Sequence, residues 1–221
     1  MLTDAVPRDP ELLRIHRVKY YHHLLESLGK PPEPQAPAIE VAPADDEWAV
    51  ERLPKGRPLV GINPGATYGE AKQWFPDRFI ETARRLAKKR GASFAVVGGP
   101  AERELGDRVA AEIGPAAVSL AGRTSLPQLA AVIRRCSLFL TNDTGPMHVA
   151  AAVGVPIVAI FGPTDWVATP PYGDAHSIVR KPIECSPCLK RVCPLGHHNC
   201  MKWVTVDDVV EACERRLGAA R

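Results

Sequence analysis

One loop of this 221-residue chain combines residue types that bind phosphate. It covers residues 142–148, reads Asn-Asp-Thr-Gly-Pro-Met-His, and follows a short apolar run. Where a strand passes through such a turn into a helix, free backbone N–H groups at the helix N-terminus bind anions. Thr144 and Gly145 are the predicted N–H donors. Asp143 lies at the strand tip, and His148 lies one turn from Thr144 on the same helix face. The structural alternative is that Asp143 caps the helix and His148 is a partly buried helix residue.

A second loop offers related chemistry. Residues 63–67 read Asn-Pro-Gly-Ala-Thr, and Lys72 follows five positions later. A Pro-Gly turn lets the backbone approach a ligand closely, while Thr67 supplies a hydroxyl and Lys72 a cation. Together these groups could hold phosphate oxygens, although ordinary turn chemistry produces the same pattern.

Two further loops could complete a pocket. Residues 98–102 read Gly-Gly-Pro-Ala-Glu and follow the second expected strand, where an acid often contacts ribose hydroxyls. Glu102 is therefore a candidate ribose ligand, although Gly-Gly-Pro is otherwise only a turn. Residues 122–126, which read Gly-Arg-Thr-Ser-Leu, follow the third expected strand.

These loops need a scaffold that brings them to one edge. Segments that are apolar throughout alternate with amphipathic helical patterns, which indicates a parallel sheet covered by helices on both faces. The predicted fold class is α/β and Rossmann-like, and such sheets bind ligands at the carboxyl ends of their strands. The expected strands are 59–63, 94–98, 118–120, 138–141 and 157–161, and the expected helices are 76–90, 101–113, 125–135, 146–153 and about 206–217.

Several other functional classes lack their sequence signatures here. The dinucleotide fingerprint Gly-x-Gly-x-x-Gly and the Walker loop are missing, which argues against a standard NAD enzyme or NTPase. A Gly-x-Ser-x-Gly nucleophile elbow is missing as well. The net charge of +3 is too small to indicate a nucleic-acid partner.

The chain divides into three predicted segments. Residues 1–30 contain apolar side chains at helical spacing, and Gly29 followed by prolines supplies a stop. Residues 31–57 begin with five prolines in fourteen positions and are predicted to be an extended linker. Residues 58–221 form the α/β domain, in which a Pro-, Gly- and Cys-rich stretch precedes the final helix.

Composition bears on the cellular location. Hydrophobic residues make up 45% of the chain, but no apolar run reaches the roughly 18 residues of a membrane span. Met1 is followed by Asp4, Arg8 and Asp9 instead of a signal sequence, so we expect a cytoplasmic protein. The basic run 88–90 is either a solvated helix face or a patch that favours an anionic membrane surface or lipid substrate.

Five blocks in order resemble the donor domain of the ADP-heptose:lipopolysaccharide heptosyltransferases of glycosyltransferase family 9. The cysteine-rich segment 185–201 is similar to that of the members which add the second heptose of the inner core. The resemblance covers about residues 58–217. The blocks are Asn63-Pro64-Gly65-Ala66 with Lys72-x-Trp74, Val97-Gly98-Gly99-Pro100, Gly122-x-Thr124-Ser125-Leu126, Asn142-Asp143-Thr144-Gly145-Pro146-Met147-His148, and Phe161-Gly162-Pro163-Thr164-Asp165.

This resemblance implies one half of a GT-B fold, ADP-heptose as the donor substrate, and inverting transfer with ADP leaving. It implies no required cofactor: the leaving charge would be stabilised by Lys72 and a helix N-terminus instead of a metal. Asp143 and Lys72 are the implied catalytic residues. The resemblance implies that Thr67 and Lys72 contact the diphosphate, and that Thr144 and Gly145 bind it through their N–H groups. Asp143 would bind heptose hydroxyls, and His148 would lie beside the donor. Glu102 would contact the ribose, and Thr124 belongs to the loop that would line the adenine pocket.

The resemblance also has a large departure. Complete members carry roughly twice the α/β material, and their proposed general base, an Asp, lies in an N-terminal domain that binds the heptosyl-Kdo-lipid A acceptor. Residues 2–30 resemble only the last helix of that domain. The expected partners are therefore a nucleotide-sugar donor, a lipid A–core acceptor held by the missing domain, and peripherally the cytoplasmic face of the inner membrane. The alternatives are an isolated ADP-sugar-binding domain without activity of its own, and a Rossmann-like scaffold whose cysteine segment binds zinc and a protein partner.

Four of the six cysteines form a cluster in the sequence, at Cys185, Cys188, Cys193 and Cys200. Cys-x-x-Cys followed by further Cys and His residues could form a tetrahedral zinc site. The second pair is spaced by six residues, wider than usual, so zinc is not the favoured interpretation. The other two interpretations are a labile disulfide and reduced cytosolic thiols.

Overall fold

A six-stranded, fully parallel sheet forms the centre of the protein, whose computed structural model describes residues 6, 10–33, 35–56, 58–67 and 69–219. The predicted fold class is thereby confirmed. The strand order is β3-β2-β1-β4-β5-β6, so the chain runs outward in one direction and then returns to place β4 beside β1. The strands are β1 (Leu59–Asn63), β2 (Ser93–Val96), β3 (Ala117–Ser119), β4 (Leu138–Asn142), β5 (Ile157–Ile160) and β6 (His176–Val179).

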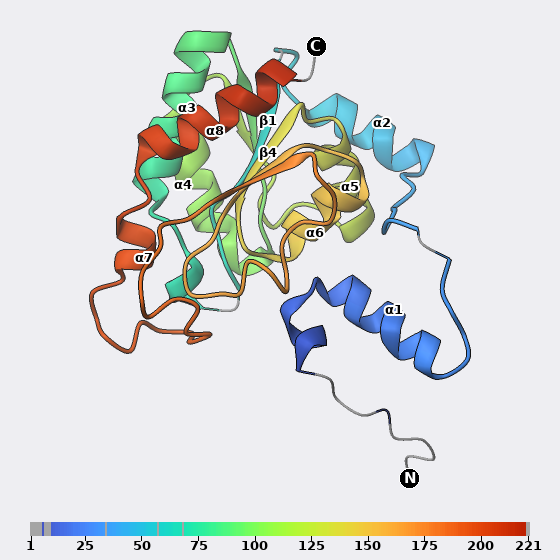
Figure 1. Cartoon of the computed structure of the whole chain (residues 1–221). Helices are drawn as coiled ribbons and strands as arrows, with labels where there is room; N and C mark the ends of the chain where they lie inside the picture. Colours follow the sequence, from blue (N-terminus) through green and yellow to red (C-terminus); the bar gives the residue numbers. More distant parts are fainter. Residues whose placement is uncertain (1–5, 7–9, 34, 57, 68, 220–221) are drawn as a thin grey trace.

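Helices cover both faces of the sheet (Figure 1). One face carries α3 (Pro76–Arg90), α4 (Arg103–Ile113) and α8 (Val206–Ala219). The other carries α2 (Pro43–Arg52), α5 (Leu126–Arg134) and α6 (Gly145–Ala152). A short helix, α7 (Asn199–Lys202), precedes α8, and α1 (Arg17–Ser27) lies apart from the domain near the N-terminus.

Local sequence sets the ends of these helices. α3 begins with Pro76, whose fixed φ suits the first turn, and ends at Gly91, which adopts the left-handed conformation with φ of 63°. α5 begins at the predicted N-cap Ser125, whose hydroxyl accepts a hydrogen bond from the Gln128 N–H while the Gln128 side chain returns to the Ser125 N–H. These reciprocal bonds satisfy donors that a helix otherwise leaves unpaired.

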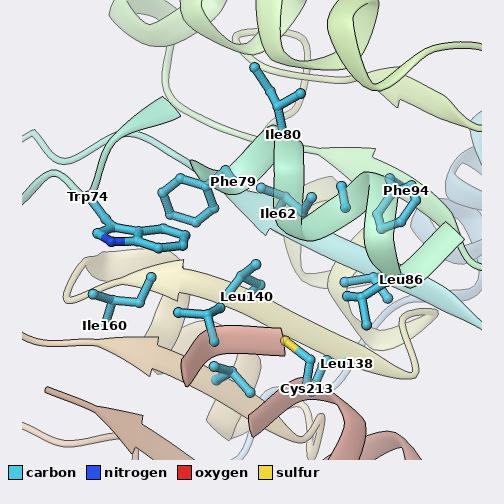
Figure 2. Close-up of a cluster of buried hydrophobic side chains, with 14 of the residues drawn as sticks. Ile62, Trp74, Phe79, Ile80, Leu86, Phe94, Leu138, Leu140, Ile160 and Cys213 are labelled. Atoms are coloured by element: carbon cyan, nitrogen blue, oxygen red, sulfur yellow. The ribbon is translucent and has the colours of Figure 1, made fainter. Parts of the chain in front are cut away.

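The larger hydrophobic core lies between the sheet and the layer of α3, α4 and α8. Trp74 and Phe79 are fully buried there and meet edge to face, with ring centroids 5.0 Å apart (Figure 2). Burying a side chain of this kind stabilises the fold by about 1.5–3 kcal/mol. The Trp74 indole N–H also donates to the carbonyl of Val204, at 3.0 Å, which ties the loop after β1 to the segment before α8.

The structure differs from the sequence-based expectation in several elements, which include short 3-10 helices at Glu70–Lys72 and Pro100–Glu102. The expected N-terminal helix is divided into a 3-10 helix, Glu11–Arg14, and α1, with extended backbone at Ile15 between them. The segment expected to be linker contains α2. β6 and α7 were not expected at all.

α2 is a packed element and not a spacer. Ala49 is fully buried against the core, and Asp46 pairs with Arg134 and Arg135 next to the end of α5. Hydrogen bonding to the Arg135 guanidinium, ahead of the other influences, holds the pKa of Asp46 below its ordinary value. The expectation of an unpacked linker over 31–57 is therefore wrong for residues 43–52. The first residues, on which the expectation of no signal sequence rests, lie outside the described part of the chain, as do residues 34, 57, 220 and 221.

Candidate functional site

The loops after β1 and β4 are held together by Asn142. Its buried side chain donates to the carbonyls of Pro64 and Gly65, at 2.9 and 3.1 Å, and accepts from the Trp74 N–H at 3.0 Å. One amide thus fixes the backbone on both sides of the segment that carries Thr67. β1 and β4 are the two strands between which the direction of winding reverses, and sheets of this type bind ligands at such a point.

The N-terminus of α6 faces the crevice without a side-chain cap. Thr144 occupies the N-cap position, but its hydroxyl makes no capping bond. That hydroxyl instead contacts the Thr141 hydroxyl at 3.2 Å and accepts from the Asn63 amide at 3.3 Å. Asp143 does not cap the helix either, because its carboxylate is held by Lys72. Pro146 has no N–H and the Met147 N–H donates to the Thr144 carbonyl, so the Gly145 N–H is the first-turn donor placed for an anion.

Lys72 and Asp143 form an ion pair in the wall of this crevice. The Lys72 ammonium lies 2.8 Å from Asp143 Oδ2 and 3.4 Å from the Asp143 carbonyl oxygen. The two side chains are 14% and 7% exposed, so both are largely removed from water while remaining next to the open cavity. A carboxylate has further acceptor positions besides the one that the ammonium occupies, so it is suited to hold ligand hydroxyls.

His148 lies on the same wall. Its residue is exposed toward the cavity, yet desolvation by the surrounding protein lowers the pKa of its imidazole. The charge of Asp143 opposes this shift, whereas His16 and Lys72 add to it. The ring therefore favours its neutral form near neutral pH, in which one nitrogen donates and the other accepts.

Two adjoining cavities share Thr67 and Thr144 in their walls. The larger, of about 500 Å³, contains Lys72, Asp143, Gly145 and His148. The smaller, of about 220 Å³, contains Glu102 and Thr124 together with the apolar side chains of Leu126, Leu129, Pro100 and Pro146. The structure therefore brings every predicted donor-binding residue to one continuous site. Their individual roles stay predictions.

Glu102 lies over the loop after β1. Its Oε2 accepts from the Gly99 N–H at 2.7 Å, and its Oε1 lies so close to Gly65 that a Cβ there would be 1.9 Å away. A side chain at Gly65 would therefore have to displace the Glu102 carboxylate. The carboxylate also lines the smaller cavity.

Several residues of the larger cavity were not predicted from the sequence, Thr164 and Arg17 among them. Thr164 is 7% exposed, and its hydroxyl makes no hydrogen bond within the described residues. It belongs to the quoted block Phe161–Asp165, which was a usable signal. Arg17 comes from the N-terminal segment, and no motif pointed to it. An unpaired, buried hydroxyl in a cavity wall indicates a place for a polar ligand group.

The four clustered cysteines line one small apolar cavity of about 20 Å³. All four are free thiols, and within the described residues no three Cys, His, Asp or Glu side chains form a metal-binding group. Backbone N–H groups, first that of His198, lower the pKa of Cys193. Burial raises the pKa of Cys200 to about 11, with the other three cysteines adding to the effect. The pKa values of the Cys193 and Cys200 thiols are thus shifted in opposite directions.

Two arginines near the end of α3 form ion pairs. Arg85 pairs with Glu81 and Asp207, and Arg90 pairs with Glu214 of α8. Of the helices in the described ranges, none combines the length and the apolar character that crossing a bilayer requires.

A comparison with protein-family models decides the family. The model described as glycosyltransferase family 9 (heptosyltransferase) matches residues 1–199. The chain belongs to this family. The sequence-based resemblance is thereby confirmed.

Individual relatives within family 9 are heptosyltransferases. The chain is 35% identical over 170 residues to the lipooligosaccharide heptosyltransferase 2 of Campylobacter jejuni, covering 75% of this chain and 53% of that protein. It is 30% identical over 181 residues to the lipopolysaccharide heptosyltransferase 2 of Escherichia coli, covering 79% and 52%. The chain thus spans about half the length of the curated relatives it matches.

Solved structures agree with this assignment. The chain superimposes on the ADP-heptose lipopolysaccharide heptosyltransferase II of E. coli with a TM-score of 0.73 and 29% identity, covering 86% of this chain and 56% of that one. A family 9 glycosyltransferase of Veillonella parvula gives a TM-score of 0.80 with 26% identity, covering 96% and 62%. The parallel sheet and its covering helices are thus shared with these solved glycosyltransferases.

Proposed function

We propose that this chain forms the ADP-heptose donor site of a family 9 heptosyltransferase, which transfers heptose to a heptosyl-Kdo-lipid A acceptor with inversion. The observation that carries the proposal is the pair of cavities that meet at Thr67 and Thr144, beside the uncapped N-terminus of α6 and Lys72. A nucleoside diphosphate sugar has the matching order of parts: a base and ribose, two phosphates, and a sugar.

Each part of the donor has a matching surface. The apolar wall of the smaller cavity, with exposed Leu126, suits an adenine ring, and Glu102 suits ribose hydroxyls. Thr67 and the first N–H groups of α6 suit the phosphates. In the larger cavity Asp143 and the unpaired Thr164 hydroxyl suit heptose hydroxyls. These assignments agree with the roles that the family resemblance implies.

The transfer step needs groups from both the donor side and the acceptor side. The bond between the heptose anomeric carbon and the β-phosphate oxygen breaks, and the acceptor hydroxyl oxygen forms the new bond to that carbon. Lys72 and the α6 N-terminus stabilise the charge that develops on the departing ADP, so no metal is required for that role. Because Asp143 accepts from Lys72, it acts in binding, and the acceptor hydroxyl loses its proton to a base on the acceptor side. The acceptor is a lipid, so we place the reaction at the cytoplasmic face of the inner membrane.

The experiment combines donor binding and transfer on the same preparation. The chain is titrated with ADP-heptose and then incubated with ADP-heptose and heptosyl-Kdo-lipid A, with ADP release and acceptor mass as readouts. Addition of one heptose that is lost in Asp143→Ala supports the full proposal. Donor binding without transfer would identify an ADP-sugar-binding domain that needs a separate acceptor half. Failure to bind ADP-heptose would overturn the proposal.

A further inference from the structure

The segment before the proline-rich stretch folds back onto the rim of the larger cavity. The Arg17 N–H donates to the Ala168 carbonyl at 2.8 Å, and His16 Nε2 lies 2.9 Å from the Pro170 carbonyl. The His16 ring also meets the Tyr172 ring edge to face, with centroids 5.1 Å apart. These contacts join residues about 150 positions apart in the sequence. α1 is thereby held at the donor site although it does not pack into the domain core (Figure 1).

The His16 ring also sets the start of α1. Its Nδ1 accepts from the Val18 N–H at 3.1 Å, so the proton lies on Nε2, which donates to the Pro170 carbonyl. One ring thus caps the helix and attaches it to the loop 162–172. The next residue, Arg17, is placed in the wall of the larger cavity as a consequence.

Arg17 brings a cation to this cavity that the ion pairs of the site do not neutralise. Lys72 is already paired with Asp143. No ion pair joins Arg17 to a carboxylate within the described residues, and its guanidinium lies 5.6 Å from the centre of the Tyr20 ring. The nearby Asp165 accepts from the N–H groups of Val167 and Ala168. An arginine carries five N–H donors in a planar fork that fits phosphate oxygens.

We propose that Arg17 binds the β-phosphate of the nucleoside diphosphate and that docking of the segment 10–27 on the loop 162–172 delivers it. The inference rests on the proposed donor site. The β-phosphate is chosen over the α-phosphate because Arg17 lines the larger, sugar-side cavity and is not part of the smaller, nucleoside-side cavity. The donor site is then complete only when this segment is in place, and donor binding orders α1.

The test is calorimetric titration of the full chain with ADP and with AMP. Arg17→Ala should weaken ADP binding about 10- to 100-fold, the range for loss of a charge-assisted hydrogen bond, and should leave AMP binding unchanged. Arg17→Lys should recover part of the loss, because an ammonium keeps the charge but not the fork. The matched control is Arg14→Ala, whose side chain is 79% exposed and pairs with Glu11 on the same segment.

The delivery step has its own variant. His16→Ala removes both the cap and the contact with Pro170, so it should weaken ADP binding as much as Arg17→Ala does, and the double variant should be no weaker than either single one. Equal ADP affinity in wild type and Arg17→Ala would overturn the inference while leaving the donor site intact. An equal loss of AMP and ADP affinity would assign Arg17 a purely structural role. Absence of ADP binding by the wild type would refute the donor site itself.

Discussion

Replacement of Lys72 by methionine should separate the two roles of the Lys72–Asp143 pair. Methionine keeps most of the apolar stem and removes the ammonium, which leaves the 6%-exposed Asp143 beside the cavity without that cation. Breaking a fully buried pair costs about 3–5 kcal/mol. This pair borders an open cavity that can hydrate the carboxylate, so we expect a loss of about 2 kcal/mol in the free energy of unfolding.

The assay is a double-mutant cycle by urea unfolding, with Asp143→Asn as the second change. Asparagine has the shape of aspartate but no charge, so Lys72→Met in that background should cost about 1–2 kcal/mol less than in the wild type. The two single variants should differ in their effect on ADP affinity. Lys72→Met should weaken ADP binding by about 1.5–3 kcal/mol, whereas Asp143→Asn should leave it unchanged or tighten it, because a carboxylate next to the diphosphate is removed. Additive unfolding energies, or equal losses of ADP affinity in the two single variants, would refute this description of the pair.

Three further predictions follow from single contacts. Gly65→Ala should weaken ADP binding, because the added Cβ would meet the Glu102 side chain. The double variant Gly65→Ala/Glu102→Ala should unfold at a higher temperature than Gly65→Ala alone. Equal unfolding temperatures would contradict the close approach of Glu102 to Gly65. The pKa of His148 is lowered in the folded state, so the unfolded state takes up the proton first and stability falls as the pH drops below about 6.5. In urea titrations His148→Gln should therefore lose less stability than the wild type between pH 7 and pH 5. The same dependence of stability on pH in both proteins would count against the pKa shift. At pH 7.5 iodoacetamide should alkylate Cys193 faster than Cys200, whose pKa is raised to about 11. Peptide mass spectrometry measures the two rates. The reverse order would exclude stabilisation of the Cys193 thiolate by backbone N–H groups.

The sheet could be predicted because four of its strands are apolar on both faces. A run such as Leu59–Asn63 is buried at every position, and that continuous pattern is legible in the sequence. β6 was missed for the opposite reason. His176–Val179 is a short edge strand with mostly half-buried or exposed residues, so it lacks the apolar run that marked the others. α2 was missed because Pro43 was counted with the linker prolines, although a proline at the first turn begins a helix.

The site was predictable to the extent that its residues lie in loops directly after strands. Thr67, Lys72 and Asp143 follow β1 and β4, and parallel strands bring such loops together whatever the details of packing. The pairing of Lys72 with Asp143 could not be predicted, because it joins positions 71 residues apart through a turn whose shape depends on Asn142. The position of Arg17 could not be predicted either, since it depends on the chain folding back across the proline-rich stretch.

The most direct test of the donor site is a crystal structure of the chain with ADP. We expect the diphosphate within hydrogen-bond distance of the Thr144 and Gly145 N–H groups and of the Lys72 ammonium, with the adenine in the smaller cavity beside Leu126. ADP bound elsewhere, or in this crevice with the adenine in the larger cavity, would contradict it.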